Sequence, residues 1–154
     1  MILVLVAPLV LLYFTVNRSQ VFHLFFFGYT VHLLWSYIDI VLERYSILIH
    51  SYFIAPIFPY AINMTASAIP VAYLLLYQHC INHNKNFFIY SLFLGAIIAF
   101  GLAPIEMFIG MMKMSKGMNL LFLFFIDVAI GYAAYFLTKL VSKMSRNELF
   151  QEKS

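Results

Sequence analysis

Charged residues are scarce in this sequence of 154 residues, because Asp, Glu, Lys and Arg together make up only 10% of it. Soluble domains carry roughly 25% charged residues, so the chain lacks the polar surface that a water-soluble fold needs. The formal net charge is +3, and the basic residues form no continuous patch of the kind that binds nucleic acid. The composition therefore argues against a soluble fold and predicts no nucleic-acid partner.

Residues typical of catalytic and metal sites are also rare. The single cysteine, Cys80, excludes an intramolecular disulfide. The sequence contains no phosphate-binding loop, no zinc-protease motif and no known Ser-His-Asp order. His79 and His83 lie four residues apart, but this spacing is common and no fourth ligand is evident, so we interpret the segment as an ordinary polar loop. We predict that the protein is not an enzyme and holds no metal ion or other cofactor.

Hydrophobic residues, in contrast, make up 64% of the chain, and the mean hydropathy is +0.93. A helix needs about 20 apolar residues to cross the hydrocarbon core of a bilayer. A first, shorter apolar segment has no basic residue before it and no clear signal-peptide cleavage site, so we interpret it as a short span. The predicted fold class is all-α, a polytopic transmembrane helical bundle in a single domain of about five spans: 2–16, 21–42, 59–77, 87–112 and 120–141.

The polar segments beside these spans predict the orientation in the bilayer. Residues 43–56 mix polar and aromatic side chains, which is typical of an interfacial segment or a short helix lying at the lipid headgroups, and residues 142–154 form a tail. Lys and Arg accumulate on the cytoplasmic side of membrane proteins. The N-terminus is therefore predicted outside and the C-terminal tail in the cytoplasm, with Arg18, Lys85, Lys139, Lys143, Arg146 and Lys153 on the cytoplasmic side against Arg44, Lys113 and Lys116 outside.

Three acidic residues fall inside the predicted spans, namely Asp39, Glu106 and Asp127. Acidic side chains are costly in lipid and usually face the interior of a bundle. Residues three or four apart share a helical face, and small residues on such a face allow close helix packing. The residues that share these faces are Gly28, His32 and Ser36 for Asp39; Gly95, Ala99, Ala103 and Gly110 for Glu106; and Gly131, Ala134 and Thr138 for Asp127.

The predicted depths of the acids bring them into one layer. At 1.5 Å per residue, Asp39, Glu106 and Asp127 lie about 5, 9 and 11 Å inside the outer boundary. Asn63, early in the third span, falls at a similar level, and His32 lies two turns from Asp39. We therefore predict a polar cluster in the outer half of the bundle.

Two interpretations of this cluster remain open. The acids could hydrogen-bond to Tyr, Ser or Asn side chains, or pair with Lys113, and so determine how the helices pack. They could instead form a site for a proton, a cation or a small ligand, with His32 as a relay. The first reading predicts a structural or accessory membrane protein, and the second a small transporter, channel or ligand-binding protein. The predicted partners are the lipid bilayer and either further copies of the chain, in a homo-oligomer, or another membrane protein.

The order of features also resembles a known family. The segments that carry the resemblance are HLLWSYID, NMTASAIPVAYLLLY and PIEMFIGMMKMSKGMNLLFLFFID. They are similar to a family of small, uncharacterised multi-pass membrane proteins of endospore-forming Bacillota. That family has a proline-bearing third span, matched by Pro70–Tyr77, then a glutamate-bearing span and a Gly-aromatic-Asn turn, in which Met118 here replaces the aromatic residue. The resemblance implies a protein of the bacterial cytoplasmic membrane and implies no activity.

Overall fold

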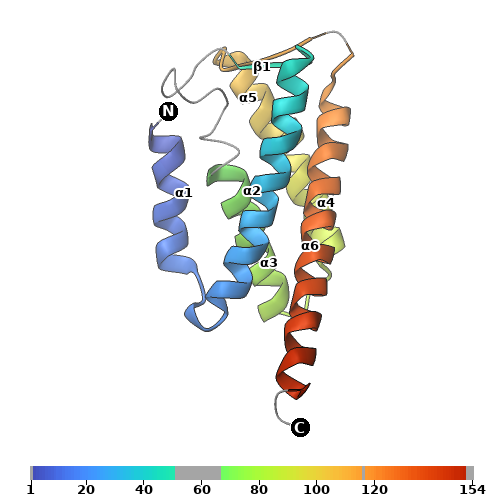
Figure 1. Ribbon diagram of the computed structural model, residues 1–154. Helices are drawn as coiled ribbons and strands as arrows, with labels where there is room; N and C mark the ends of the chain where they lie inside the picture. The colour runs from blue at the N-terminus through green and yellow to red at the C-terminus, as the bar shows by residue number, and fades with distance from the viewer. Residues whose placement is uncertain (1, 51–66, 116, 152–154) are drawn as a thin grey trace.

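The computed structural model describes residues 2–50, 67–115 and 117–151, and the chain forms a bundle of helices with a small sheet at one end (Figure 1). Most of the apolar runs become α-helices, as predicted from their composition. The elements in chain order are α1 (Ile2–Thr15), the 3-10 turn η1 (Arg18–Gln20), α2 (Val21–Arg44), β1 (Leu48–His50), α3 (Ile69–Asn82), α4 (Phe87–Ile97), the π-helical segment η3 (Ile98–Leu102), α5 (Ala103–Phe108), β2 (Met112–Met114) and α6 (Leu120–Gln151).

Three helical stretches among the described residues are long and apolar enough to cross a membrane. They run over Arg18–Arg44, Phe87–Phe108 and Leu120–Met144, with 27, 22 and 25 residues. The prediction of membrane-length helices is thereby confirmed for these three. Helices α1 and α3 have 14 residues each, about 21 Å of helix, and most of the first half of the predicted span 59–77 lies outside the described residues.

The predicted span 87–112, which contains Glu106, ends earlier in the structure than the sequence predicts. The fourth span was predicted as helix to residue 112, but α5 ends at Phe108, and Gly110 adopts a φ of +78° just after it. Met112–Met114 then forms β2, which pairs antiparallel with β1 so that Ile49 lies opposite Lys113. Lys113 therefore does not lie on the same helix as Glu106. The prediction that the two could pair along one helical face was wrong.

The strand β1 also corrects two predictions. It lies within the predicted interfacial segment 43–56, of which 51–56 are outside the described residues, and it shows that the described part after Arg44, residues 45–50, is not a short helix. The pairing of β1 with β2 means that the described fold is not entirely α-helical. At the other end of the chain, α6 continues to Gln151, so the predicted tail 142–154 begins as helix.

A π-helical segment interrupts the helix that carries Glu106. Pro104 has no backbone N–H, and its ring would collide with a carbonyl one turn earlier in a regular α-helix. Just before it, the Ala103 N–H donates to the Ile98 carbonyl across five residues, which is the π-helical pattern. The wider turn accommodates Pro104 without ending the helix, and α5 then carries Glu106 to the end of the bundle.

Helix α2 lies at the centre of the bundle. It packs against α3 and α6, while α4 packs against both of these helices and α1 packs against α3 on the other side (Figure 1). Gln78 ties α1 to this arrangement, because its Oε1 accepts from the Asn17 N–H at 2.8 Å and its Nε2 donates to the Thr15 carbonyl at 2.9 Å. These bonds satisfy backbone groups that the end of α1 would otherwise leave open.

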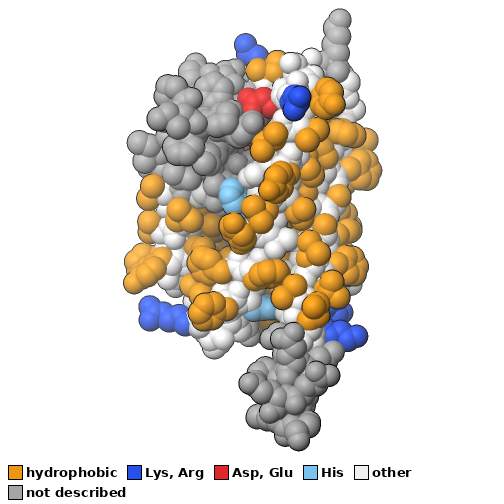
Figure 2. All heavy atoms as spheres, viewed as in Figure 1, with side chains coloured by type: hydrophobic (Ala, Val, Ile, Leu, Met, Phe, Trp, Pro, Cys, Tyr) orange, Lys and Arg blue, Asp and Glu red, His pale blue; other side chains and the backbone are white. Residues whose placement is uncertain are grey.

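The outside of the bundle is apolar. Phe22 is 90% exposed and Phe108 is 93% exposed, at opposite ends of the molecule. Figure 2 shows apolar side chains over the visible face, with Lys and Arg side chains at its two ends. Such a surface would promote aggregation in water but suits contact with lipid chains, which supports a location in a membrane.

Candidate functional site

Asp127 is the acidic side chain whose contacts are best defined. It lies on α6 with an exposed fraction of 0%, and Trp35 on α2, itself 3% exposed, donates its indole N–H to Asp127 Oδ1 at 3.0 Å. The Tyr73 hydroxyl, on α3, donates to the backbone carbonyl of Asp127 at 2.8 Å. One turn of α6 is thus hydrogen-bonded to two neighbouring helices.

The second oxygen of this carboxyl is less well satisfied. Asp127 Oδ2 is buried and has no hydrogen-bond partner in the described part of the chain. The hydroxyl of Ser91 on α4, a residue with 0% exposure, is in the same condition. Groups of this kind are costly to bury, so Asp127 combines a bonded oxygen with one that could still take a partner.

Small residues allow the helices to approach each other around Asp127. A Cβ atom on Gly131 would lie 2.6 Å from Tyr73 Cε1 and 2.8 Å from Ser91 Oγ. A Cβ atom on Gly95 would lie 2.9 Å from Val128 Cγ2. The predicted role of the Gly131 face in close packing is therefore borne out by these contacts, and the same close approach brings Tyr73 within reach of the Asp127 carbonyl.

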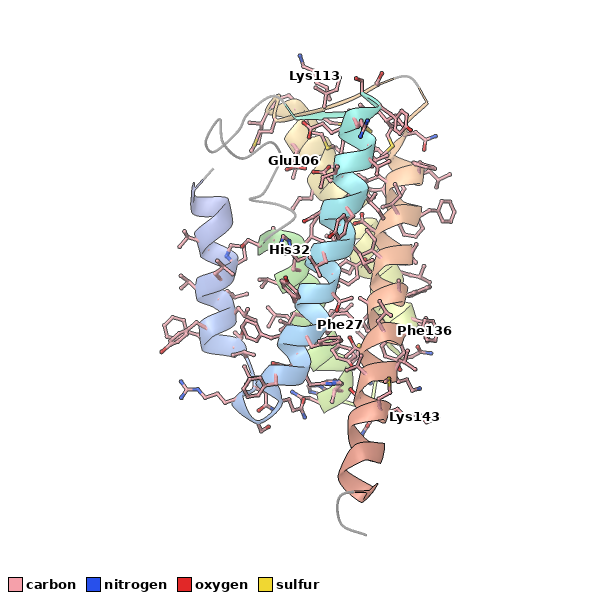
Figure 3. All side chains as sticks on the ribbon, viewed as in Figure 1. Phe27, His32, Glu106, Lys113, Phe136 and Lys143 are labelled. Atoms are coloured by element: carbon pink, nitrogen blue, oxygen red, sulfur yellow. The ribbon has the colours of Figure 1, made fainter. Side chains whose placement is uncertain are left out.

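Asp39 and Glu106 form a second acidic group, closer to the end of the bundle. Asp39 is 1% exposed and lies within electrostatic range of Glu106 on α5 and of Glu43 one turn along α2. Figure 3 shows Glu106 beside α2 and Lys113 directed away from the bundle at its end. Asp39 and Glu106 thus lie within electrostatic range of each other. Sequence reasoning missed Glu43, which we had assigned to the interfacial segment although it lies four residues from Asp39.

His32 is less buried than its neighbours along the same side of α2. The buried residues of this helix follow the line Leu24, Phe27, Gly28, Val31, Trp35, Asp39 and Leu42. His32 is half-buried, lies 3.4 Å from Ser36 Oγ through Nδ1, and lines a groove of about 150 Å³ between α1, α2 and α3. His32 and Ser36 therefore lie on the same side of α2 as Asp39, as their spacing predicts, but they are less deeply buried. Asn63, the remaining member of the predicted cluster, lies outside the described residues.

A second polar group, which the sequence analysis missed, lies toward the opposite end. Ser142 donates its hydroxyl proton to the Thr138 carbonyl at 2.8 Å, so its oxygen can accept from His23 Nδ1 at 3.0 Å. In a neutral imidazole, His23 Nε2 then accepts from the Tyr77 hydroxyl at 2.8 Å. His23 sits in an apolar run near the start of a predicted span, and only its position opposite Ser142 and Tyr77 reveals this role.

An aromatic layer lies between the two polar groups. Phe27 stacks on Tyr77 with ring centroids 4.3 Å apart, and Phe87 stacks on Tyr135 at 4.9 Å. Tyr77 and Phe87 also meet edge to face at 5.7 Å, so the rings form one continuous contact. Figure 3 shows Phe27 on α2 below the level of His32. This layer is closely packed and apolar, and it separates the Trp35–Asp127 contact from His23.

The described residues offer little for metal chemistry. Within them, no group of three or more His, Cys, Asp or Glu side chains is placed to hold a metal ion. The rings of His79 and His83 stack with centroids 4.3 Å apart, and His83 Nδ1 lies 3.0 Å from the His79 carbonyl. Their arrangement is that of two stacked residues on one helix end.

Comparison with known proteins does not add a relationship: no family model, no curated protein and no solved structure matches the chain.

Proposed function

We propose that this chain is a structural or accessory multi-pass membrane protein whose buried polar side chains hold its helices together. One observation carries the proposal. Asp127, at 0% exposure, is bonded through its side chain to Trp35 and through its backbone to Tyr73, so a single turn of α6 joins α2 and α3. In lipid, where apolar burial does not drive helices together, such bonds and close packing supply the stability.

Other polar contacts have the same character. His23 bonds to Tyr77 and to Ser142, which connects α2 with α3 and with α6. Tyr132 on α6 donates to the Phe88 carbonyl on α4 at 3.2 Å. Each of these side chains bridges two helices, and none of them requires a bound ligand to be satisfied. This pattern favours a structural role over a binding site.

The cellular setting belongs to the same proposal. Five spans, with the N-terminus outside and the C-terminus inside, agree with the excess of Lys and Arg on the predicted cytoplasmic side. The resemblance to membrane proteins of endospore-forming Bacillota favours the bacterial cytoplasmic membrane. The proposed role involves neither an enzymatic activity nor a nucleic-acid partner. A second copy of the chain or another membrane protein is the partner that an accessory role requires.

A second candidate function rests on the oxygen that the structural role leaves open. Asp127 Oδ2 is buried without a hydrogen-bond partner in the described part of the chain. At the same end of the bundle, Asp39 lies within electrostatic range of Glu43 and of Glu106. Intramembrane carboxyl groups in such a setting are typical of proton pathways. This candidate is a small proton- or cation-handling protein.

Infrared spectroscopy of the folded protein distinguishes the two candidates. Asp127→Asn keeps an oxygen that can accept from Trp35, so the fold should survive, and the difference between the two spectra isolates the Asp127 carboxyl. If Asp127 is structural, we expect this difference spectrum to stay constant between about pH 5 and about pH 7, within the range in which a histidine proton relay would change charge.

The opposite result has an equally definite meaning. A carboxyl band of Asp127 that appears and disappears reversibly across this pH range would overturn the structural role and support proton handling. Vesicles loaded with a pH-sensitive dye would then show faster proton entry with the native chain than with Asp127→Asn. Glu106→Gln serves as the parallel variant for the Asp39–Glu106 pair.

A further inference from the structure

A half-polar pocket lies at the end of the bundle opposite the acidic groups. It has a volume of about 370 Å³ and lies between the turn that joins α3 to α4 and the side of α6. Its polar rim comes from the turn and its apolar wall from aromatic side chains. The lining residues are Tyr77, Cys80, Ile81, Asn84, Lys85, Asn86, Phe87, Phe88 and Tyr135.

The turn that forms the rim is held in one conformation. Asn84 adopts a φ of 51°, in the left-handed region that asparagine tolerates better than most residues. The Lys85 N–H donates to the Cys80 carbonyl at 2.9 Å, and Asn86 Oδ1 caps α4 by accepting from the Phe88 N–H at 3.0 Å. The backbone that carries the side chains of Lys85 and Asn86 is thus already ordered. Ligand binding would therefore cost little backbone conformational entropy.

The charged side chains that the structure describes at this end are all basic. Among the residues with described side chains, the basic ones here are Arg18, Lys85, Lys139 and Lys143, whereas the acidic ones lie in the other half of the bundle. Lys139 Nζ lies 5.9 Å from the centre of the Tyr135 ring, which forms part of the pocket wall. Two ammonium groups therefore flank the pocket, and they favour an anionic occupant.

The apolar wall continues onto the lipid-facing side of the bundle. Phe88 lines the pocket and lies 5.9 Å from Phe136, which is 58% exposed. Figure 3 shows Phe136 on the outer side of α6, above Lys143. A ligand with a charged head at Lys85 and a hydrocarbon chain along Phe88 and Phe136 would match both parts of this surface.

We propose that this pocket binds an anionic glycerophospholipid of the surrounding leaflet. The phosphate contacts Lys85 and the Asn86 amide, with Lys139 adding charge from the side, and one acyl chain lies along Phe88 and Phe136. Free phosphate shares the head chemistry but would leave the aromatic wall uncovered, so a membrane lipid is the better fit. Basic pockets between transmembrane helices commonly bind anionic lipid headgroups.

Native mass spectrometry of the full chain in neutral detergent tests the proposal. Palmitoyl-oleoyl phosphatidylglycerol should remain bound at concentrations where the phosphatidylcholine with the same chains is lost. Lys85→Gln should weaken retention of phosphatidylglycerol about fivefold, as expected for the loss of one surface cation, and Lys85→Arg should preserve it. Lys113→Gln, which removes an exposed cation at the other end, should leave it unchanged.

Three outcomes would overturn the proposal. Equal retention of the two lipids would show that charge does not select the occupant. Loss of binding in Lys113→Gln as large as that in Lys85→Gln would show general attraction rather than a site. Displacement of the lipid by millimolar inorganic phosphate would show that the head alone is recognised. Lys85 is exposed and its backbone makes the turn, so melting temperatures of its variants in neutral detergent should equal that of the native chain.

Discussion

Gly131→Ala should be among the most destabilising single substitutions in this chain, with a loss of about 2–3 kcal/mol in the free energy of unfolding. Its new Cβ would lie 2.6 Å from Tyr73 Cε1 and 2.8 Å from Ser91 Oγ. Tyr73 has no room to move, because its ring is 0% exposed and its hydroxyl is bonded to the Asp127 carbonyl. The helices α3, α4 and α6 must separate, and that separation also breaks this hydrogen bond.

Two other glycines provide a graded control for this result. Gly101→Ala adds a Cβ with no atom within 4 Å, so we expect no loss and a gain of up to about 1 kcal/mol. Gly95→Ala should fall between the two, because its Cβ would meet the Val128 Cγ2 atom at 2.9 Å and a single methyl group must yield. Equilibrium unfolding in mixed micelles measures all three. Equal values for Gly131→Ala and Gly101→Ala would contradict the packing described at Asp127.

Trp35→Ala should cost about 3–5 kcal/mol, since it removes a buried indole and leaves a cavity between α2 and α6. Trp35→Phe keeps most of the ring but removes the N–H that Asp127 Oδ1 accepts, so its cost should be smaller, about 1–2 kcal/mol. The difference between these variants separates volume from hydrogen bonding. Tyr37→Ala, at a side chain 66% exposed on the same helix, should change stability by less than about 0.5 kcal/mol.

The unfolding measurement for the Trp35 series uses the same mixed micelles. A Trp35→Phe variant as stable as the native chain would mean that the indole contributes only its volume. A Tyr37→Ala variant as unstable as Trp35→Ala would mean that the helix α2 faces a different way from that described. Either result would remove the basis for a structural role of Asp127.

The sequence predicted the inward direction of the acids well, because lipid leaves few alternatives. Acidic side chains in a membrane protein usually face the bundle interior, and Asp39 and Asp127 are buried while Glu106 is half-buried. Their partners were harder to predict. Trp35 was not among the predicted partners, and nothing in the sequence indicates that it bonds to Asp127, 92 positions away. Pairing across helices depends on rotations that composition does not determine.

The ends of the helices were the least predictable parts. The pairing of β1 with β2 involves three residues on each side, and both strands lie in apolar runs that look like helix termini. The π-helical turn before Pro104 could have been anticipated, since a proline inside a long helix requires some rearrangement. That turn changes the angular position of Glu106 around the helix axis relative to Gly95. Steps of three or four residues therefore no longer identify a shared face across residue 98.

His23 illustrates a different limit. A lone histidine in an apolar run gives no spacing signal, and its partners come from α3 and α6. His32, which has a polar neighbour one turn away, attracted the functional prediction. The contacts of His23 with Tyr77 and Ser142 are made between helices, so a local pattern could not indicate them.

The central claim is that the bond between Trp35 and Asp127 holds α2 and α6 together, and a double-mutant cycle measures this bond directly. Trp35→Phe, Asp127→Leu and the double variant are unfolded in the same micelles as the native chain. We predict a coupling free energy of about 0.6–2 kcal/mol, the range for hydrogen bonds between helices in lipid. A coupling of zero, with each single variant folded, would show that the two side chains act independently and would contradict the account.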